Sequence, residues 1–357
     1  MIRAVASLAL VLCCWAAGAE TLLEPDRIRQ IEAILTREMS GQKIPGLTIA
    51  ISRGADMLWT NGYGMSDIEN FVPAKSSTLF RTASIAKPMT AVAVLQLVEQ
   101  GKVQLDVPVS TYVKSFLPKQ YQVTVRQLLG HLGGVRHYRD NSEMYSTRHF
   151  WNTTEALSAF QSDDLVHEPG LKMTYTTYGY VLLGAVVEAV SGRSYWEYLR
   201  DNVLLPAGMR ATQVDDVYTI VPNRSRGYRK AGADEVVNAP LHDTSGKVPG
   251  GGLVSTSADL VRFVQALHGG KLLKKETVNQ MFTSLRTADG HTTGYGLGWG
   301  MDDFMGRRRY GHAGGQAGVS TQLQYIPSEP VTVAIMCNLE GVQVKGIADR
   351  VLEVLLQ

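Results

Sequence analysis

Short apolar or alternating runs near both ends of the chain predict β-strands. Residues 47–51 and 57–60 are expected to pair across a turn at residues 54–56. The residues between the two end regions show mainly helical spacing and few strand signals. The later strands are expected at residues 294–299, 309–312, 319–326 and 331–337, with turns at residues 313–315 and 327–330.

Apolar residues at helical spacing predict a series of helices. The segment 84–100 is apolar nearly all round, so it is expected to be a central, buried helix. Residues 215–252 are rich in breakers and are expected to be irregular. The other helices are expected at residues 28–39, 125–129, 154–160, 178–190, 195–204, 257–267 (capped by Ser257) and 344–356.

Strands at the two ends and helices between them predict an α+β fold. The expected architecture is one antiparallel sheet, flanked by the N- and C-terminal helices, with a mainly helical lobe inserted between its parts. Residues 20–83 and 250–357 would form the sheet lobe, and residues 84–249 the helical lobe. The active site is expected between the lobes, with loops 136–170 and 215–250 shaping its pocket.

The first 19 residues have the layout of a secretory signal peptide. Arg3 gives a short positive region, residues 4–15 are almost wholly apolar, and Ala17-Gly18-Ala19 offers small residues for cleavage. We therefore expect an exported protein, periplasmic or secreted; a retained N-terminal anchor is the alternative. The apolar run is shorter than the ~20 residues that cross a membrane, and no later segment is long and apolar enough to do so.

Composition narrows the classes of partner. The 357 residues include 35 Lys and Arg against 33 Asp and Glu, a net charge of +2, and no basic cluster exceeds Arg307-Arg308-Arg309. Nucleic-acid binding is therefore not expected. Without the signal segment only Cys337 remains, which excludes an internal disulfide. Its apolar surroundings predict a structural, buried thiol.

Ser84-Ile85-Ala86-Lys87 carries candidate chemistry at the start of the buried helix. The i, i+3 spacing places Ser84 and Lys87 on one helical face, ~5–6 Å apart. A serine hydroxyl needs an adjacent base, and burial would lower the pKa of a lysine toward the neutral form that can act as one. The segment 40–43 has the same spacing but lies where no helix is expected to align the pair. Pro88 requires the helix to begin near Ser84.

With this motif and two later ones, the sequence resembles the serine β-lactamase and penicillin-binding-protein-like hydrolases, on the class C side. Their three motifs are S-x-x-K, Y-x-N, and K-T-G or H-x-G. The order and rough spacing hold here, with flanking blocks at residues 128–134, 251–256 and 295–299. The three motifs correspond to Ser84–Lys87, Tyr175-Thr176-Thr177 and His312-Ala313-Gly314.

The resemblance implies roles for individual residues. Ser84 would be the acylated nucleophile, and Lys87 and Tyr175 would share proton transfer; which of the two takes the serine proton is left open. Proximity to Lys87 is expected to favour the Tyr175 phenolate. The amides of Ser84 and Gly315 would form an oxyanion hole. Thr177, His312, Gly314 and Gly315 form the expected substrate-binding and oxyanion set.

Two departures from the family pattern bear on the substrate. Thr177 replaces the asparagine of the second motif, and a hydroxyl offers fewer hydrogen bonds than an amide. His312 replaces the third-motif lysine and should be largely neutral near pH 7. Both changes argue against efficient penicillin hydrolysis. Motif details, including the block 131–138, are most similar to the mitochondrial serine β-lactamase-like branch, which is regarded as peptidase-like.

The expected function is that of an exported serine hydrolase that acts through an acyl-enzyme. Its substrate would be a small-molecule or peptide ester or amide, and no metal or cofactor is expected. A β-lactamase or D-Ala-D-Ala carboxypeptidase is the alternative within the class. A non-catalytic binding or assembly protein on the same scaffold is the alternative of another class. The sequence does not indicate the oligomeric state.

Overall fold

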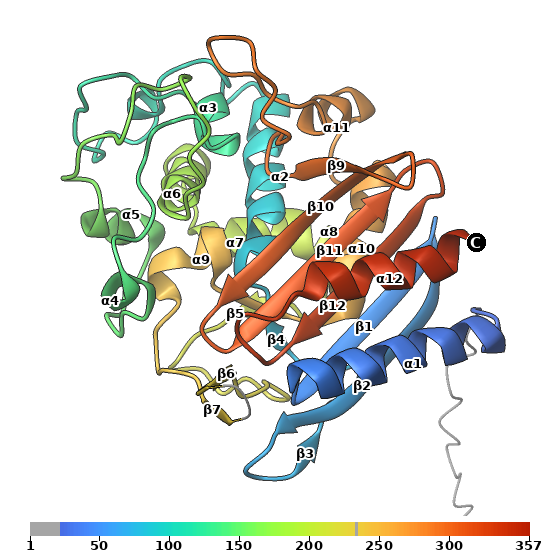
Figure 1. Ribbon diagram of the computed structural model, residues 1–357. Helices are drawn as coiled ribbons and strands as arrows, with labels where there is room; N and C mark the ends of the chain where they lie inside the picture. Colours follow the sequence, from blue (N-terminus) through green and yellow to red (C-terminus); the bar gives the residue numbers. More distant parts are fainter. Residues whose placement is uncertain (1–21, 233–234) are drawn as a thin grey trace, which may run out of the picture.

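The computed structural model describes residues 22–232 and 235–357, so the expected signal segment lies outside the described residues. Within them, seven antiparallel strands form the central sheet in the order β3-β2-β1-β12-β11-β10-β9 (Figure 1). Its strands are β1 (Gly46–Arg53), β2 (Asp56–Asp67), β3 (Val72–Pro73), β9 (Gly300–Phe304), β10 (Arg307–Gln316), β11 (Val319–Ile326) and β12 (Val331–Cys337).

The helices lie on both faces of this sheet. The terminal helices α1 and α12 cover one face, and the helices from the middle of the chain gather beyond the other (Figure 1). The helices are α1 (Pro25–Gln42), α2 (Ala86–Glu99), α3 (Val125–Leu129), α4 (Asn141–Met144), α5 (Thr153–Ala156), α6 (Tyr178–Ser191), α7 (Tyr195–Leu199), α8 (Leu205–Ala207), α9 (Val248–Gly251), α10 (Ser257–His268), α11 (Lys275–Met281) and α12 (Val344–Leu356).

Successive apolar side chains along a strand point to opposite faces of the sheet and so join two hydrophobic cores. In β12, Val333 and Ile335 join the core under α1 and α12, while Ala334 and Met336 join the core that contains α2, α6 and α10. A strand buried on both faces reads as a continuous apolar run rather than as an alternating one. Cys337 ends this strand fully buried, and burial raises the pKa of its thiol to about 12, so the predicted structural thiol is confirmed.

The expected α+β class is confirmed by the structure. The buried helix predicted after Ser84 is α2, whose side chains are almost all buried. The division into two lobes at residues 83 and 250 stays a prediction. Shorter strands that the sequence pattern did not predict surround the central sheet: β4 (Phe80–Arg81), β8 (Leu253–Ser255) and β5 (Gln213–Val214) form one small sheet, and β6 (Tyr228–Lys230) pairs with β7 (Val236–Asn238).

Three local predictions are wrong. The expected strand at residues 294–299 is not formed, because Gly294 and Gly298 adopt positive φ and break extended backbone; the strand begins at Gly300 instead. The expected turn at residues 313–315 is part of β10, which continues to Gln316. The cap of α10 is Thr256 rather than Ser257, since the Thr256 side chain accepts from the amide of Asp259.

Among residues 22–232 and 235–357, no helix has the length and apolar character that crossing a membrane requires.

Candidate active site

Ser84 lies in a 3-10 turn that leads directly into α2, and Lys87 lies in the first turn of that helix. The predicted spacing brings Lys87 Nζ to 3.0 Å from Ser84 Oγ. Pro88 is tolerated because it also falls in the first turn, where an N–H has no intrahelical acceptor. Ala83, just before the serine, has φ 46°, a left-handed conformation that is costly for a residue with a Cβ. The surrounding packing therefore maintains a strained backbone at Ala83, directly before the serine.

Lys87 is fully buried, and its amine contacts three oxygens. Besides the serine, Nζ lies 2.9 Å from the carbonyl oxygen of Gly250 and 3.3 Å from Thr177 Oγ1. None of these groups carries a negative charge, so the hydrogen bonds compensate the desolvation of an ammonium only in part. Burial, and secondarily repulsion by Lys247, holds the pKa of Lys87 well below its ordinary value. The site thus contains an amine that can be neutral beside a serine hydroxyl.

Tyr175 lies on the other side of the same amine. Lys87 Nζ is 4.8 Å from the centre of the Tyr175 ring, and the ring packs against His131 with centroids 4.3 Å apart. Burial raises the pKa of the Tyr175 hydroxyl, while a hydrogen bond with Ser84 opposes that shift less strongly. The expectation that Lys87 favours the Tyr175 phenolate is therefore wrong. The same burial also disfavours the charged form of the lysine, which weakens the cation on which that expectation relied.

Thr177 takes the place that the second motif assigns to it, at the start of α6. Its hydroxyl contacts Lys87, and its amide donates to His137 Nδ1 at 3.2 Å. Burial first, and then the repulsion of nearby cations, lowers the pKa of His137 to about 4. His137 is therefore a neutral acceptor at pH 7, and it anchors the backbone that presents Thr177.

His312 is buried in β10 and has both ring nitrogens engaged. Nε2 lies 2.9 Å from the Tyr295 hydroxyl, and Nδ1 lies 2.7 Å from the carbonyl oxygen of Ala313. Burial and, to a smaller extent, Lys87 lower the pKa of His312 to about 3. The ring is neutral at pH 7, as the sequence predicts, and it cannot act there as a fixed cation for a substrate carboxylate.

One edge of β10 is open beside Ser84. β11 pairs with β10 along Tyr310–Gln316, but on the other edge β9 pairs only as far as Gly311. In the described part of the chain, no strand continues this second edge beyond that point. An extended substrate could therefore add its backbone beside residues 312–316.

The two glycines of this edge have different surroundings. A Cβ on Gly315 would meet no heavy atom within 4 Å, which leaves open space in front of it. A Cβ on Gly314 would lie 2.6 Å from the carbonyl oxygen of Thr82 and would also clash with Thr321 Oγ1. Gly314 therefore lets β10 pack against the segment that carries Ser84, whereas Gly315 faces free space that a substrate could occupy.

Two pockets meet at Ser84, Tyr175 and Gly315. The first, of about 370 Å³, extends along β10 to His312 and Tyr295. The second, of about 100 Å³, extends toward the helical side of the site. Its further lining residues are His137, Tyr138, Met144, Thr177, Lys247, Gly250, Gly251 and Gln316. Both loop regions that were expected to shape the pocket, 136–170 and 215–250, contribute to it.

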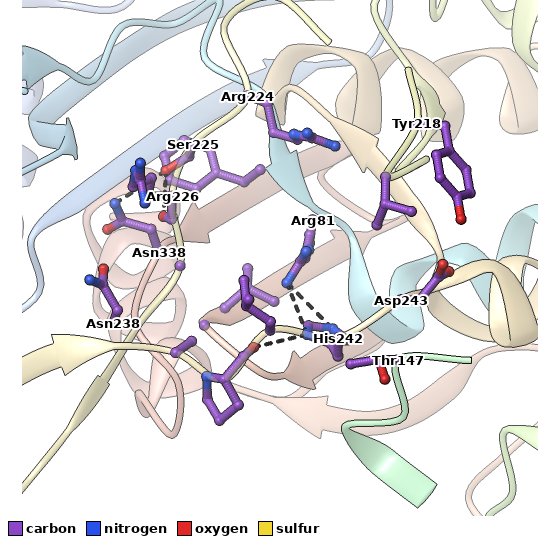
Figure 2. Close-up of a pocket in the computed structure, with 18 residues that line it drawn as sticks. Arg81, Thr147, Tyr218, Arg224, Ser225, Arg226, Asn238, His242, Asp243 and Asn338 are labelled. Carbon is purple, nitrogen blue, oxygen red and sulfur yellow. Dashed lines mark hydrogen bonds between the residues drawn. The ribbon is translucent and has the colours of Figure 1, made fainter. Parts of the chain in front are cut away.

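A separate cavity of about 790 Å³ is lined by Arg81, Arg224 and His242, among others (Figure 2). Neither the candidate nucleophile nor the buried lysine lines it. Its arginines are already paired, because Arg81 Nε and Arg224 Nη1 lie 2.5 Å and 3.0 Å from the two carboxylate oxygens of Asp215. This cavity is therefore a weaker candidate for the reaction centre than the two pockets at Ser84.

The structure brings together Ser84, Lys87, Tyr175, Thr177, His312 and Gly315, all of which the sequence singled out. The competing pair Ser40 and Lys43 lies at the end of α1 and lines neither pocket at Ser84. Sequence reasoning missed His137, Tyr295, the Gly250 carbonyl and Lys247. The blocks 131–138 and 295–299 contain His137 and Tyr295 without assigning them a role, and the placement of loop 215–250 near the pocket was the signal for Lys247.

Comparison with known proteins places this geometry in a family. The chain matches the family model described as Beta-lactamase over residues 31–356. It is 28% identical to the human "Serine beta-lactamase-like protein LACTB, mitochondrial", over 86% of this chain and 76% of that protein.

Two solved structures show the same architecture at similar identity. The octameric penicillin-binding protein homologue from Pyrococcus abyssi has a TM-score of 0.81 and 28% identity, covering 92% of this chain and 77% of that one. The D-amino acid amidase from Ochrobactrum anthropi SV3, complexed with L-phenylalanine amide, has a TM-score of 0.82 and 26% identity, covering 93% of this chain and 99% of that one. The chain therefore belongs to the β-lactamase family of serine hydrolases.

Proposed function

We propose that the protein hydrolyses an amide, peptide or ester through an acyl-enzyme on Ser84. The observation that carries this proposal is the contact of 3.0 Å between Ser84 Oγ and the amine of Lys87. That amine is buried without an acidic partner, and its pKa is held well below the ordinary value. A neutral amine in hydrogen-bond reach of a serine hydroxyl is what a general base for acylation requires.

In the proposed acylation step, Lys87 Nζ takes the proton of Ser84 Oγ as that oxygen attacks the substrate carbonyl. The oxyanion forms between the amides of Ser84 and Gly315. Tyr175, held neutral by burial, then donates its proton to the leaving atom and recovers one from the Lys87 ammonium. The bond to the leaving group breaks and the acyl group stays on Ser84. Water hydrolyses the ester by the same proton path in reverse.

The surroundings of His312 favour a substrate other than a penicillin. The ring is neutral and both its nitrogens are engaged, so it offers no fixed positive charge for the carboxylate of such a substrate. The free edge of β10 suits an extended acyl chain or peptide. The amidase among the similar structures supports amide or peptide chemistry for this scaffold.

Covalent labelling followed by intact-mass measurement tests the proposal. A fluorophosphonate probe should add one adduct per chain, and the adduct should be absent in Ser84→Ala. If a folded protein takes no adduct from a fluorophosphonate or a penicillin, it is a binding or assembly protein rather than a hydrolase. Turnover of nitrocefin at rates comparable to those of a p-nitrophenyl ester and a peptide library would replace the preferred substrate class with β-lactams.

We also propose that the protein is exported, on the signal-peptide layout of residues 1–19. Expression of the full chain should yield a mature protein whose N-terminus is Glu20, recovered outside the cytoplasm. An intact mass that retains the first 19 residues, in a membrane-bound fraction, would indicate a retained anchor instead.

A further inference from the structure

Lys247 is a second buried lysine at the candidate active site, and the proposed proton transfers do not use it. Its residue is only 6% exposed, and Nζ donates one hydrogen bond, of 3.3 Å, to the carbonyl oxygen of Met144. Nζ also lies 5.5 Å from the centre of the Tyr138 ring. Within residues 22–232 and 235–357, no carboxylate forms an ion pair with it. Buried lysines are uncommon and are normally paired.

The charge state of Lys247 differs from that of Lys87. Burial first, and then Arg81, lowers the pKa of Lys247, while Asp215 and Asp243 oppose the shift, so that it settles at about 8. The side chain therefore carries a positive charge at pH 7. An ammonium has three N–H donors, and one acceptor at 3.3 Å leaves most of that capacity unused.

Lys247 lies close enough to the nucleophile for its charge to contact a bound substrate. Lys247 and Ser84 line the same pocket of about 100 Å³, together with Thr177 and Gln316. At ~30 Å³ per water molecule, this space holds about three waters, or a group the size of a carboxymethyl. The larger pocket of about 370 Å³ shares Ser84, Tyr175 and Gly315 with it but is otherwise lined from the strand side, by residues that include Tyr295 and His312. A leaving group can depart through the larger pocket, while the acyl group stays in the smaller one.

We propose that Lys247 binds a carboxylate on the acyl group of the substrate, in the small pocket beside Ser84. This inference rests on the proposed hydrolase function and deepens it by naming the substrate class: short acyl groups with a terminal carboxylate. A carboxylate there would accept from the unused donors of the ammonium and would supply the negative charge that the buried cation lacks. The cation that binds the substrate carboxylate would then be Lys247, whereas the third-motif residue His312 is neutral.

Paired esters test the proposal. 4-Nitrophenyl hemisuccinate carries the terminal carboxylate, and 4-nitrophenyl 4-methylpentanoate has nearly the same shape without the charge. Rates are measured against a Ser84→Ala blank, which removes spontaneous hydrolysis. The wild-type protein should prefer the anionic ester in kcat/KM by about 10-fold or more, as expected for a hydrogen bond between charged groups.

Variants assign the preference to Lys247. Lys247→Met should lower the ratio of the two kcat/KM values, anionic over neutral ester, by about 10-fold or more. Because Lys247 also repels Lys87, the readout is this ratio and not the neutral-ester rate alone. Lys247→Arg should keep part of the preference. Lys119→Met is the matched control, because Lys119 also donates to loop carbonyls, of Gln161 and Asp163, but lines neither pocket at Ser84. It should change neither rate.

The outcomes separate the two proposals. Hydrolysis of the neutral ester without any preference for the anionic one, or a preference that survives in Lys247→Met, overturns the carboxylate site and leaves the hydrolase intact. No hydrolysis of either ester, together with no fluorophosphonate adduct at Ser84, overturns the proposed function itself. Equal losses for both esters in Lys247→Met, with unchanged thermal stability, would also count against a carboxylate-specific role.

Discussion

At the scale of single residues, burial moves two pKa values of the site in opposite directions. Desolvation disfavours the charged form of any group, so it lowers the pKa of the Lys87 amine and raises that of the Tyr175 hydroxyl. In both groups burial favours the neutral form. A neutral amine can accept a proton and a neutral phenol can donate one, which supports Lys87 as the proposed base and Tyr175 as the proposed acid.

Removing either group should slow acylation. Lys87→Met keeps the length of the side chain without the amine, and Tyr175→Phe keeps the ring that packs on His131 without the hydroxyl. Each should lower the acylation rate at least ~10²-fold, the usual contribution of a positioned acid or base. Single-turnover measurement with a p-nitrophenyl ester gives this rate directly. Wild-type acylation in a folded variant would exclude the removed group from proton transfer.

The pH dependence of acylation checks which group is the base. Lys87 must be deprotonated to accept the serine proton, so the rate should rise with pH through its pKa and then level off. Because burial lowers that pKa, the rise should be complete well below the ordinary lysine value of ~10.4. In Tyr175→Phe the slower rate should keep the same rising limb. A rate that increases only near pH 10 would contradict a buried, neutral Lys87.

The sequence predicts part of this chemistry and not the rest. The S-x-x-K spacing and the resemblance identify Ser84, Lys87 and Tyr175, because those inferences depend on local geometry and motif order. The ionisation of Tyr175 depends on how deeply the phenol is enclosed, which sequence does not give; proximity to a lysine alone led to the wrong direction. Lys247 was missed for the same reason, since its proposed role depends on burial without a carboxylate in ion-pair contact.

At the scale of secondary-structure elements, the contact between β10 and the turn that carries Ser84 positions the site. Apolar periodicity predicted the strand near residues 309–312, but the run of small residues after it was interpreted as a turn. The structure continues β10 through Gly314 and Gly315. Small residues are needed there because the strand passes close to the backbone at Thr82, and sequence alone does not distinguish that requirement from a turn.

The two glycines allow a matched experiment. Gly314→Ala places a Cβ against Thr82 and Thr321, so it should lower the free energy of unfolding by about 1–3 kcal/mol, as overpacking does, and should also slow acylation. Gly315→Ala projects into open space, so stability should change little while kcat/KM falls. Thermal unfolding and ester hydrolysis of both variants measure the two effects. The opposite pattern, with Gly315→Ala the less stable variant, would contradict the different roles.

At the scale of the whole molecule, the sheet joins segments that are far apart in the chain. β1 pairs with β12, so Leu47 lies opposite Cys337. The pattern predicted strands at both ends and therefore the class of fold. It did not predict the strand order, because many pairings satisfy the same alternation of apolar residues.

Buried neutral histidines should make the whole fold sensitive to acid. His242 is an example that lies outside the proposed mechanism. It is buried, with 5% of its surface exposed, and contacts Arg81 (Figure 2). Burial, and then repulsion by Arg81 and Lys247, lowers its pKa to about 3. His131 and His312 are likewise buried, with lowered pKa values. Each of these rings is expected to stay neutral in the folded protein where the unfolded chain is already protonated.

The sign of the effect follows from proton binding. In the unfolded chain a histidine gains a proton near pH 6.5, whereas folded His242 gains one only near pH 3. Between these values the unfolded state binds more protons, so the free energy of unfolding falls as the pH drops from about 6.5 toward 3, and is unaffected by this group above about pH 7. At pH 5 one such histidine accounts for at most about 2 kcal/mol.

Urea unfolding at pH 7.5 and 5.0 measures the loss of unfolding free energy, which should shrink by up to that amount in His242→Gln. His291→Gln, at a side chain that is 82% exposed, is the exposed control and should change the loss much less than His242→Gln does. If His242→Gln loses as much stability as the wild-type protein between the two pH values, His242 is protonated in the folded state and the acid sensitivity has another source.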